Sequence, residues 1–185
     1  MKKIFFALTT LAMLTAYGAT LDLTQAKATW TAFKTSEKVP VSGSFGDIKY
    51  KFGKGKDTIA QALEGATATI NALSVDLGDE TKNANVKEYF FAKFPKKDII
   101  KVTFKNVIEA NNKGSILATI NMNGKSVKVP MQFEIKEGMF EATGVIDIMQ
   151  FGLMDAFKSL ATLCHDLHEG LTWTQVEVSF SAPVK

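Results

Sequence analysis

The sequence predicts a mainly β protein: an antiparallel barrel of about eight strands, with an amphipathic helix late in the chain covering one end. Three observations support this fold class. Segments in which apolar and polar residues alternate recur at short intervals along the chain. Short turns rich in Asn and Gly separate several of them, as expected for antiparallel hairpins. One later segment, residues 153–167, instead has the apolar spacing of a helix.

The first two strand segments lie near the start of the barrel. Residues 26–34 alternate, with Trp30 among the small apolar residues of one face and Lys and Thr on the other. Residues 39–52 continue the strand pattern but contain Gly43 and Gly46. Two glycines in a strand pattern predict a bulge or a sharp bend, as a barrel needs at its corners.

A short helix is expected next, over residues 57–63. Asp57 can serve as its N-cap and Gly65 follows its end. Residues 66–77 return to a strand pattern, and the polar residues 78–85 are expected to form a turn.

An aromatic segment follows that turn, over residues 86–95. It places four aromatic residues within six positions, more than a surface loop normally exposes. They are Tyr89, Phe90, Phe91 and Phe94. Pro95 stops any helix there.

Four strands joined by hairpins make up the middle of the chain. They are expected over residues 99–109, 115–122, 125–136 and 139–149. Residues 111–114, 123–124 and 137–138 supply turns of the hairpin type. Pro130 falls on the polar face of the third of these strands and lacks a backbone N–H. We therefore expect an edge or a bulge at this position.

The chain ends with a helix and a last strand. Residues 153–167 place Leu153, Phe157, Leu160, Cys164 and Leu167 at intervals of four, three, four and three. This spacing predicts an amphipathic helix, and Gly170 is placed to end it. Residues 171–182, which include Trp173, predict the final strand.

The N-terminal residues 1–18 have the pattern of a cleavable secretory signal. Two lysines precede an apolar stretch over residues 4–14, and a small-x-small site ends at Gly18. The apolar stretch is too short to span a bilayer and no second one follows, so no membrane anchor is predicted. Residues 19–185 are expected to form one domain in the periplasm.

Charge and cysteine content exclude other classes. All 22 basic residues are Lys, and two of them lie in the predicted signal, which leaves 20 against 19 acidic residues. Without Arg or a basic excess, nucleic-acid binding is not expected. Cys164 is the only cysteine, so the chain can form no internal disulfide.

No stretch of the sequence predicts a catalytic, metal or cofactor site. His165, Asp166, His168 and Glu169 form the only His/carboxylate cluster, which either holds a metal or is a solvated helix end; the absence of a third ligand elsewhere favours the second. Cys164 lies on the apolar stripe of the helix, where a structural role is favoured over a nucleophilic one. No G-x-S-x-G elbow or P-loop is present.

Several segments together resemble the YceI-like family of lipocalin-like, polyisoprenoid-binding bacterial proteins. The family pattern is a strand ending S-V-D-T-G, a polar loop, an aromatic pair, Y-P, a strand carrying F-x-S and a later L-T-I-H-G run. Matching positions are residues 74–78, 89–91, 94–95, 102–106 and 119–130. Leu77, Asn106 and Asn123 depart from the pattern.

The resemblance implies a barrel enclosing an elongated tunnel that accommodates an isoprenoid or a similar amphiphile. A homodimer is compatible with the resemblance, but no heptad seam or exposed apolar strand in the sequence identifies an interface. Strand alternation and the helix stripe then select the expected lining residues, with the helix over one mouth. These are Trp30, Phe45, Val102, Phe104, Met131, Phe133, Phe140, Ile146, Phe157, Leu160 and Trp173. The candidates for orienting a polar head group are Asn71, Asp76 and Gln175.

Two alternatives remain open at the level of sequence. Small barrels are often filled by their own side chains, so the 14 Phe and 7 Met residues also suit a solid core in a stress or surface-interaction protein. An enzyme acting on a lipid or quinone would need a pair of titratable groups inside the barrel. Its candidates are Asp76, Asp147 and Glu177.

Overall fold

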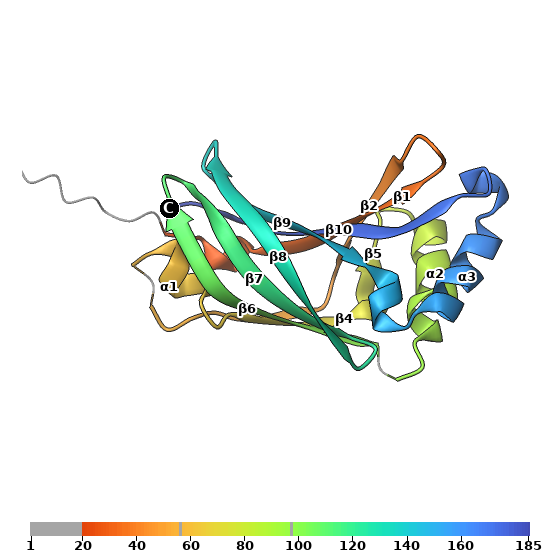
Figure 1. Ribbon diagram of the computed structural model, residues 1–185, viewed down its shortest axis with the longest axis horizontal. Helices are drawn as coiled ribbons and strands as arrows, with labels where there is room; N and C mark the ends of the chain where they lie inside the picture. The colour runs from red at the N-terminus through yellow and green to blue at the C-terminus, as the bar shows by residue number, and fades with distance from the viewer. Residues whose placement is uncertain (1–19, 56, 97) are drawn as a thin grey trace, which may run out of the picture.

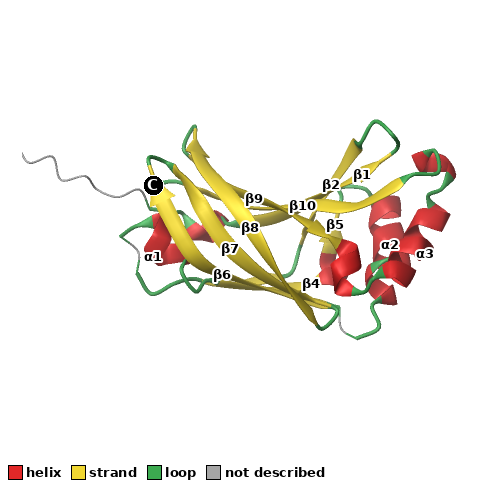
Figure 2. Ribbon diagram, viewed as in Figure 1, coloured by secondary structure: helices red, strands yellow, loops and turns green. Residues whose placement is uncertain are grey.

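The computed structural model describes residues 20–55, 57–96 and 98–185, and within them it shows a ten-stranded antiparallel sheet curled into a barrel, with helices at its two ends (Figures 1 and 2). The strands are β1 Lys27–Lys34, β2 Val39–Phe45, β3 Ile48–Lys51, β4 Thr67–Asn71, β5 Val75–Asp76, β6 Ile99–Ala110, β7 Lys113–Met122, β8 Lys125–Lys136, β9 Met139–Asp147 and β10 Thr172–Pro183. The helices are α1 Ile59–Leu63, α2 Glu80–Tyr89 and α3 Met154–Leu163. The predicted signal and its cleavage site lie outside the described residues.

The strand order confirms the predicted antiparallel architecture. It is β3-β4-β6-β7-β8-β9-β10-β1-β2-β5, so hairpins connect the central strands and β1 lies beside β10. The structure has ten strands where about eight were expected, because the two segments predicted over residues 39–52 and 66–77 each divide into two strands.

Those two divided segments close the barrel. β2 pairs with β1 and β5 at one edge of the sheet, whereas β3, only two residues further on, pairs with β4 at the other edge. At this corner the N–H of Gly46 donates to the carbonyl of Ser74 at 2.8 Å, and the N–H of Asn71 donates to that of Asp47 at 3.0 Å. The predicted bend at Gly46 is therefore confirmed.

Gly43 has a different role from the predicted bulge. It pairs in regular register with Trp30 of β1. A Cβ atom at Gly43 would lie 2.6 Å from the Trp30 ring, so only glycine leaves room for the indole to lie against β2.

Helix α1 closes the end of the barrel opposite α2 and α3 (Figure 1). Its N-cap is Thr58 rather than Asp57: the Thr58 hydroxyl oxygen accepts the N–H of Gln61 at 3.1 Å. Ile59 and Leu63 are fully buried, and α1 packs against β6. This short helix therefore owes its stability to packing rather than to its length.

Helix α2 occupies part of the stretch predicted as a turn, so that prediction was wrong. The carboxylate of Asp79 caps it by accepting the N–H of Lys82 at 2.9 Å. None of its residues is buried, and it therefore lacks the apolar stripe by which a helix is recognised. After it, Phe90, Phe91 and Phe94 pack on one another with ring centroids 5.0–5.5 Å apart.

Helix α3 is shorter than the predicted residues 153–167. It ends at Leu163, and a 3₁₀ turn, Asp166–His168, precedes two left-handed residues, Glu169 and Gly170. α3 contacts α2, and the two helices together cover one end of the barrel (Figure 2). The predicted covering helix is confirmed, with α2 as a second one. No helix in the described ranges has both the length and the apolar character needed to cross a bilayer.

Pro130 lies where the sheet opens locally. β8 pairs with β9 only from Gln132 to Lys136, so Pro130 falls outside that ladder while β7 still pairs with β8 beside it. Pro130 therefore lies at a local edge of the sheet, as predicted from the sequence, and its missing N–H leaves no hydrogen bond of the β8–β9 ladder unmade.

Candidate functional site

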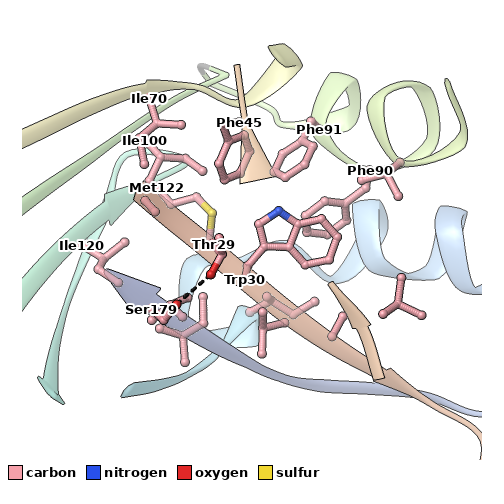
Figure 3. Close-up of a pocket in the computed structure, with 18 of the residues that line it drawn as sticks. Thr29, Trp30, Phe45, Ile70, Phe90, Phe91, Ile100, Ile120, Met122 and Ser179 are labelled. Atoms are coloured by element: carbon pink, nitrogen blue, oxygen red, sulfur yellow. Dashed lines mark hydrogen bonds between the residues drawn. The ribbon is translucent and has the colours of Figure 1, made fainter. Parts of the chain in front are cut away.

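A cavity of about 430 Å³ runs into the barrel from the end covered by α2 and α3. Its walls come from nine of the strands and both covering helices, and they are mainly apolar (Figure 3). The volume falls in the range of small-molecule binding pockets, roughly 300–1,000 Å³. The interior is therefore hollow over this length, in contrast to the solid core considered as an alternative.

The inner end of the cavity is closed by aromatic rings. Tyr50 stacks on Phe52 with ring centroids 5.6 Å apart, and Phe104 and Phe180 meet edge to face at 5.5 Å. All four side chains line the cavity. Beyond them the barrel is solid: a Cβ atom at Gly114 would lie 2.5 Å from the Phe133 ring.

The opening of the cavity lies between α2 and the segment after α3. Of the lining residues that the structure describes, only Lys82 and Leu167 are exposed, and Leu167 is 71% exposed. Both belong to the covering elements, so a ligand would enter past the helices. The exposed leucine continues the apolar wall to the molecular surface.

Nine of the eleven expected lining residues lie on the cavity wall: Trp30, Phe45, Val102, Phe104, Met131, Ile146, Phe157, Leu160 and Trp173. Phe133 and Phe140 do not. Their rings, 4.8 Å apart, belong to the solid end of the barrel behind Phe180. Both side chains face the interior of the barrel, as the alternation predicted, but they lie along the barrel axis beyond the closed end of the cavity.

Other lining residues were not selected from the sequence. Ile120 lies opposite Val102 in the β6–β7 ladder, and Met122 follows on the same face. Phe90 and Phe91 come from the aromatic segment, and they lie beside the Trp30 indole in Figure 3. The alternation of β7 could have indicated Ile120 and Met122, and the density of aromatic residues in the aromatic segment could have indicated Phe90 and Phe91.

Few polar groups reach the inner part of the cavity. Thr29 and Ser179 form a hydrogen bond between their hydroxyls at 2.7 Å (Figure 3). The Trp30 Nε1–H and the Tyr50 hydroxyl are buried without a hydrogen-bond partner among the described residues. Burial also raises the pKa of Tyr50 to about 12, so this phenol is neutral and available to donate at pH 7.

The carboxylates proposed for catalysis or head-group binding lie elsewhere. None of Asp76, Asp147 and Glu177 lines the cavity. Asp76 accepts the N–H of Gly78, which with a bond from Asn83 lowers the pKa of its carboxyl, and Asp147 caps a 3₁₀ turn. The three carboxylates on which the enzyme hypothesis was based are therefore not part of the described lining.

The other two residues expected to orient a head group, Asn71 and Gln175, also lie outside the cavity. Asn71 accepts the N–H of Leu73 and does not line the cavity, and Gln175 is exposed away from it. Within the described residues, no three His, Cys, Asp or Glu side chains converge as a metal site would require.

Polar side chains gather at the mouth of the cavity. Lys34, Lys82, Asn85, His168 and Thr172 line it there. Nδ1 of His168 lies 2.7 Å from the Thr172 hydroxyl. Partial burial, and secondarily the positive charge of Lys34, lower the pKa of His168. Burial raises the pKa of the Cys164 thiol, which suits a structural residue.

Replacing Lys34 with methionine is expected to raise the pKa of His168, because the nearby positive charge disfavours the imidazolium form. The partial burial persists in this variant, so the pKa should remain below the usual value near 6.5. A pH titration of the assigned imidazole resonances by NMR measures the change. Lys27→Met, at the other end of β1, is the matched control and should leave the pKa unaltered.

Comparison with known proteins gives a consistent assignment. A family model described as the YceI-like domain matches residues 20–183. No curated protein matches the chain. A polyisoprenoid-binding domain from Saccharophagus degradans, implicated in plant cell wall breakdown, is 16% identical, with a TM-score of 0.59 over 91% of this chain and 98% of that chain.

Two further solved structures have the same fold. BcnA of Burkholderia cenocepacia is 21% identical, with a TM-score of 0.58 over 89% of this chain and 99% of that chain. A mutant YceI protein of Campylobacter jejuni with a monobromobimane guest is 21% identical, with a TM-score of 0.53 over 75% and 83%. The family match spans nearly all described residues, and so the chain belongs to the YceI-like domain family.

Proposed function

We propose that this protein binds a long-chain isoprenoid, or a similar amphiphilic lipid, non-covalently inside the cavity. The observation that carries the proposal is the cavity itself: about 430 Å³, aromatic and aliphatic along its walls, closed at its inner end and open between α2 and the segment after α3. One protein of the same fold is described as a polyisoprenoid-binding domain, which supports the same class of ligand.

The energetics suit such a ligand. Burying one methylene group contributes about 0.8 kcal/mol, so a chain of a few isoprene units gains enough from burial alone to bind well. The walls are already formed in the folded protein, so little ordering opposes binding. Binding then needs no covalent bond and no catalytic group.

We further propose that the protein acts in the periplasm, where it carries, stores or senses the lipid. The charged and apolar pattern of residues 1–18 supports export with removal of the leader. An exported protein with an enclosed apolar cavity can hold a water-insoluble lipid away from the bilayer.

Native mass spectrometry of the protein purified from a bacterial periplasm tests the proposal. The expected result is a stoichiometric adduct on residues 19–185, and solvent extraction should release a long-chain lipid. Recovery in the periplasmic fraction at the mass of the cleaved chain tests export at the same time. A clean ligand-free mass, with no uptake of added polyprenyl lipid, would contradict the binding function.

A further inference from the structure

We propose that the outer surface of strands β3, β4, β6, β7 and β8 docks on a bilayer that contains anionic phospholipids. This surface, the basic face, is defined by six exposed lysines: Lys49, Lys51, Lys96, Lys101, Lys105 and Lys128. The inference goes beyond the proposed function, because it concerns the outside of the barrel and names a partner rather than a ligand.

The strand register gathers these lysines into two rows that cross the five strands on the outside. The first row consists of Lys49, Thr69, Lys101, Asn121 and Ser126. The second consists of Lys51, Thr67, Thr103, Thr119 and Lys128. Because alternate residues of a strand are about 6.7 Å apart and adjacent strands about 4.8 Å apart, both rows fit under one contact area. Ammonium, hydroxyl and amide groups in these rows can all donate hydrogen bonds to phosphate oxygens.

The other two lysines extend the rows along the barrel. Lys105 follows on the outer side of β6. The stem of Lys96, in the loop before β6, lies over Gly124, and this lysine borders a hollow together with Lys101 and Asn121. The basic face therefore runs along the barrel from the end that α2 and α3 cover (Figure 1).

The charge of the basic face is almost entirely of one sign. Glu109 and Glu134 are the acidic residues of these five strands, and both lie at the opposite end, where Glu134 pairs with Lys113 at 3.3 Å. Asp47 and Asp98 border the face in the turns before β3 and β6. Within the described ranges, none of the six lysines takes part in an ion pair. Their ammonium groups are therefore available to an external anion.

The opposite wall of the barrel carries acidic residues instead. Phe104 of β6 meets Phe180 of β10 across the interior, so these two strands belong to opposite walls. Outside β9 and β10, Glu141 and Glu177 are exposed. Charge is thus separated across the barrel, although the whole chain is nearly balanced. Such a separation turns the basic face toward an anionic surface as the protein approaches it.

A bilayer fits this face better than a nucleic acid does. The chain contains no Arg for bidentate contacts, and the aromatic residues of these strands, Tyr50, Phe104 and Phe133, face inward and cannot stack on bases. Dispersed lysines suit a surface of phospholipid head groups. The choice of a membrane as partner also rests on the proposed lipid binding, since a lipid carrier exchanges its ligand with a bilayer. The mouth of the cavity lies outside the basic face, so docking leaves it open.

Co-sedimentation with vesicles tests the inference. Phosphatidylcholine vesicles with and without phosphatidylglycerol are compared at about 0.1 M salt, where the Debye length is about 10 Å. Binding is expected to be at least about 25-fold tighter with phosphatidylglycerol, because each lysine near an anionic bilayer contributes about fivefold. Raising the salt concentration should reduce this preference.

A triple variant removes charge from the basic face: Lys49→Gln, Lys101→Gln and Lys128→Gln. It is expected to weaken binding to the phosphatidylglycerol vesicles about 100-fold. The matched control, Lys27→Gln, Lys87→Gln and Lys158→Gln, makes the same change in net charge at exposed lysines elsewhere. These lysines lie outside the contact area, so the control should weaken binding less than about threefold. Uptake of geranylgeraniol without vesicles should be unaltered in both variants, which checks that each is folded.

The outcomes separate the inference from the proposed function. Equal binding to both kinds of vesicle, or equal weakening in the two triple variants, overturns the basic face as a docking surface. Uptake of geranylgeraniol without any vesicle binding overturns it while lipid binding stands. Vesicle binding that depends on the face, by a protein that takes up no geranylgeraniol, supports the docking surface and contradicts the proposed function. Binding of double-stranded DNA through the face, without vesicle binding, would assign the face to a nucleic acid and overturn the inference.

Discussion

Replacing Phe140 with alanine is expected to lower the free energy of unfolding by about 3–5 kcal/mol. Phe140 is 0% exposed and packs on the rings of Phe133 and Phe180 in the solid end of the barrel. Its removal leaves a void that close-packed neighbours cannot fill, so both transfer energy and contacts are lost. Urea denaturation of lipid-free protein measures the change, since a bound lipid would stabilise the native state.

Phe45→Ala is the matched control for this prediction. Phe45 is also an inward-facing phenylalanine, but it already borders the cavity. Fewer packed atoms surround it, so its loss is expected to cost at least about 1 kcal/mol less than the loss of Phe140. Equal costs for the two variants would mean that the barrel is filled uniformly and that the cavity is not present in solution.

Replacing Ala68 with phenylalanine is expected to weaken lipid binding about 100-fold while the protein stays folded. Ala68 lines the cavity and lies between Tyr50 and Val102 in the sheet, so the new ring would project into empty space. The ring excludes the innermost part of the ligand. Losing the burial of three or four methylenes at about 0.8 kcal/mol each accounts for this factor.

Ala142→Phe provides the contrast. Ala142 is also 0% exposed but lies in the solid end, opposite Phe133 and Phe180 in the neighbouring strands. Overpacking there is expected to destabilise the protein by about 1–3 kcal/mol or more. Isothermal titration with geranylgeraniol and thermal denaturation of both variants test the pair. Unchanged lipid binding by Ala68→Phe would place the ligand outside the cavity.

The strands of this fold could be predicted from the sequence because their signals are local. The turns at Asn123–Gly124 and Glu137–Gly138 take up left-handed conformations, which Asn123 and the two glycines tolerate, and the flanking alternation fixes the strand register. Helix α2 could not be found by the same reasoning. Its residues are largely polar on every side, and the Asp79 cap was its one readable feature.

For the candidate site, the sequence could predict which side chains face the interior of the barrel, but not how far along the barrel axis the cavity extends. Alternation indicates which residues face inward, and it selected Trp30 and Val102, which lie on the cavity wall, for the same reason that it selected Phe140, which does not. Position along the barrel axis depends on how far α1 and the aromatic rings fill one end, which is a property of the folded whole. The charged mouth was missed because Lys34 and Lys82 look like ordinary surface lysines until α2 is placed over the barrel.

The pairing of β1 with β10 has a consequence for the order of events in folding. Lys27 pairs with Ser181, so the barrel cannot close until nearly the last residue of the chain is available. Such distant pairing is slow, typically milliseconds to seconds for sheet proteins. A nascent chain of this topology therefore cannot complete its barrel until nearly all of it has been synthesised. This order is compatible with the export proposed above, because an apparatus that accepts only unfolded chains would meet the protein before its barrel and its cavity have formed.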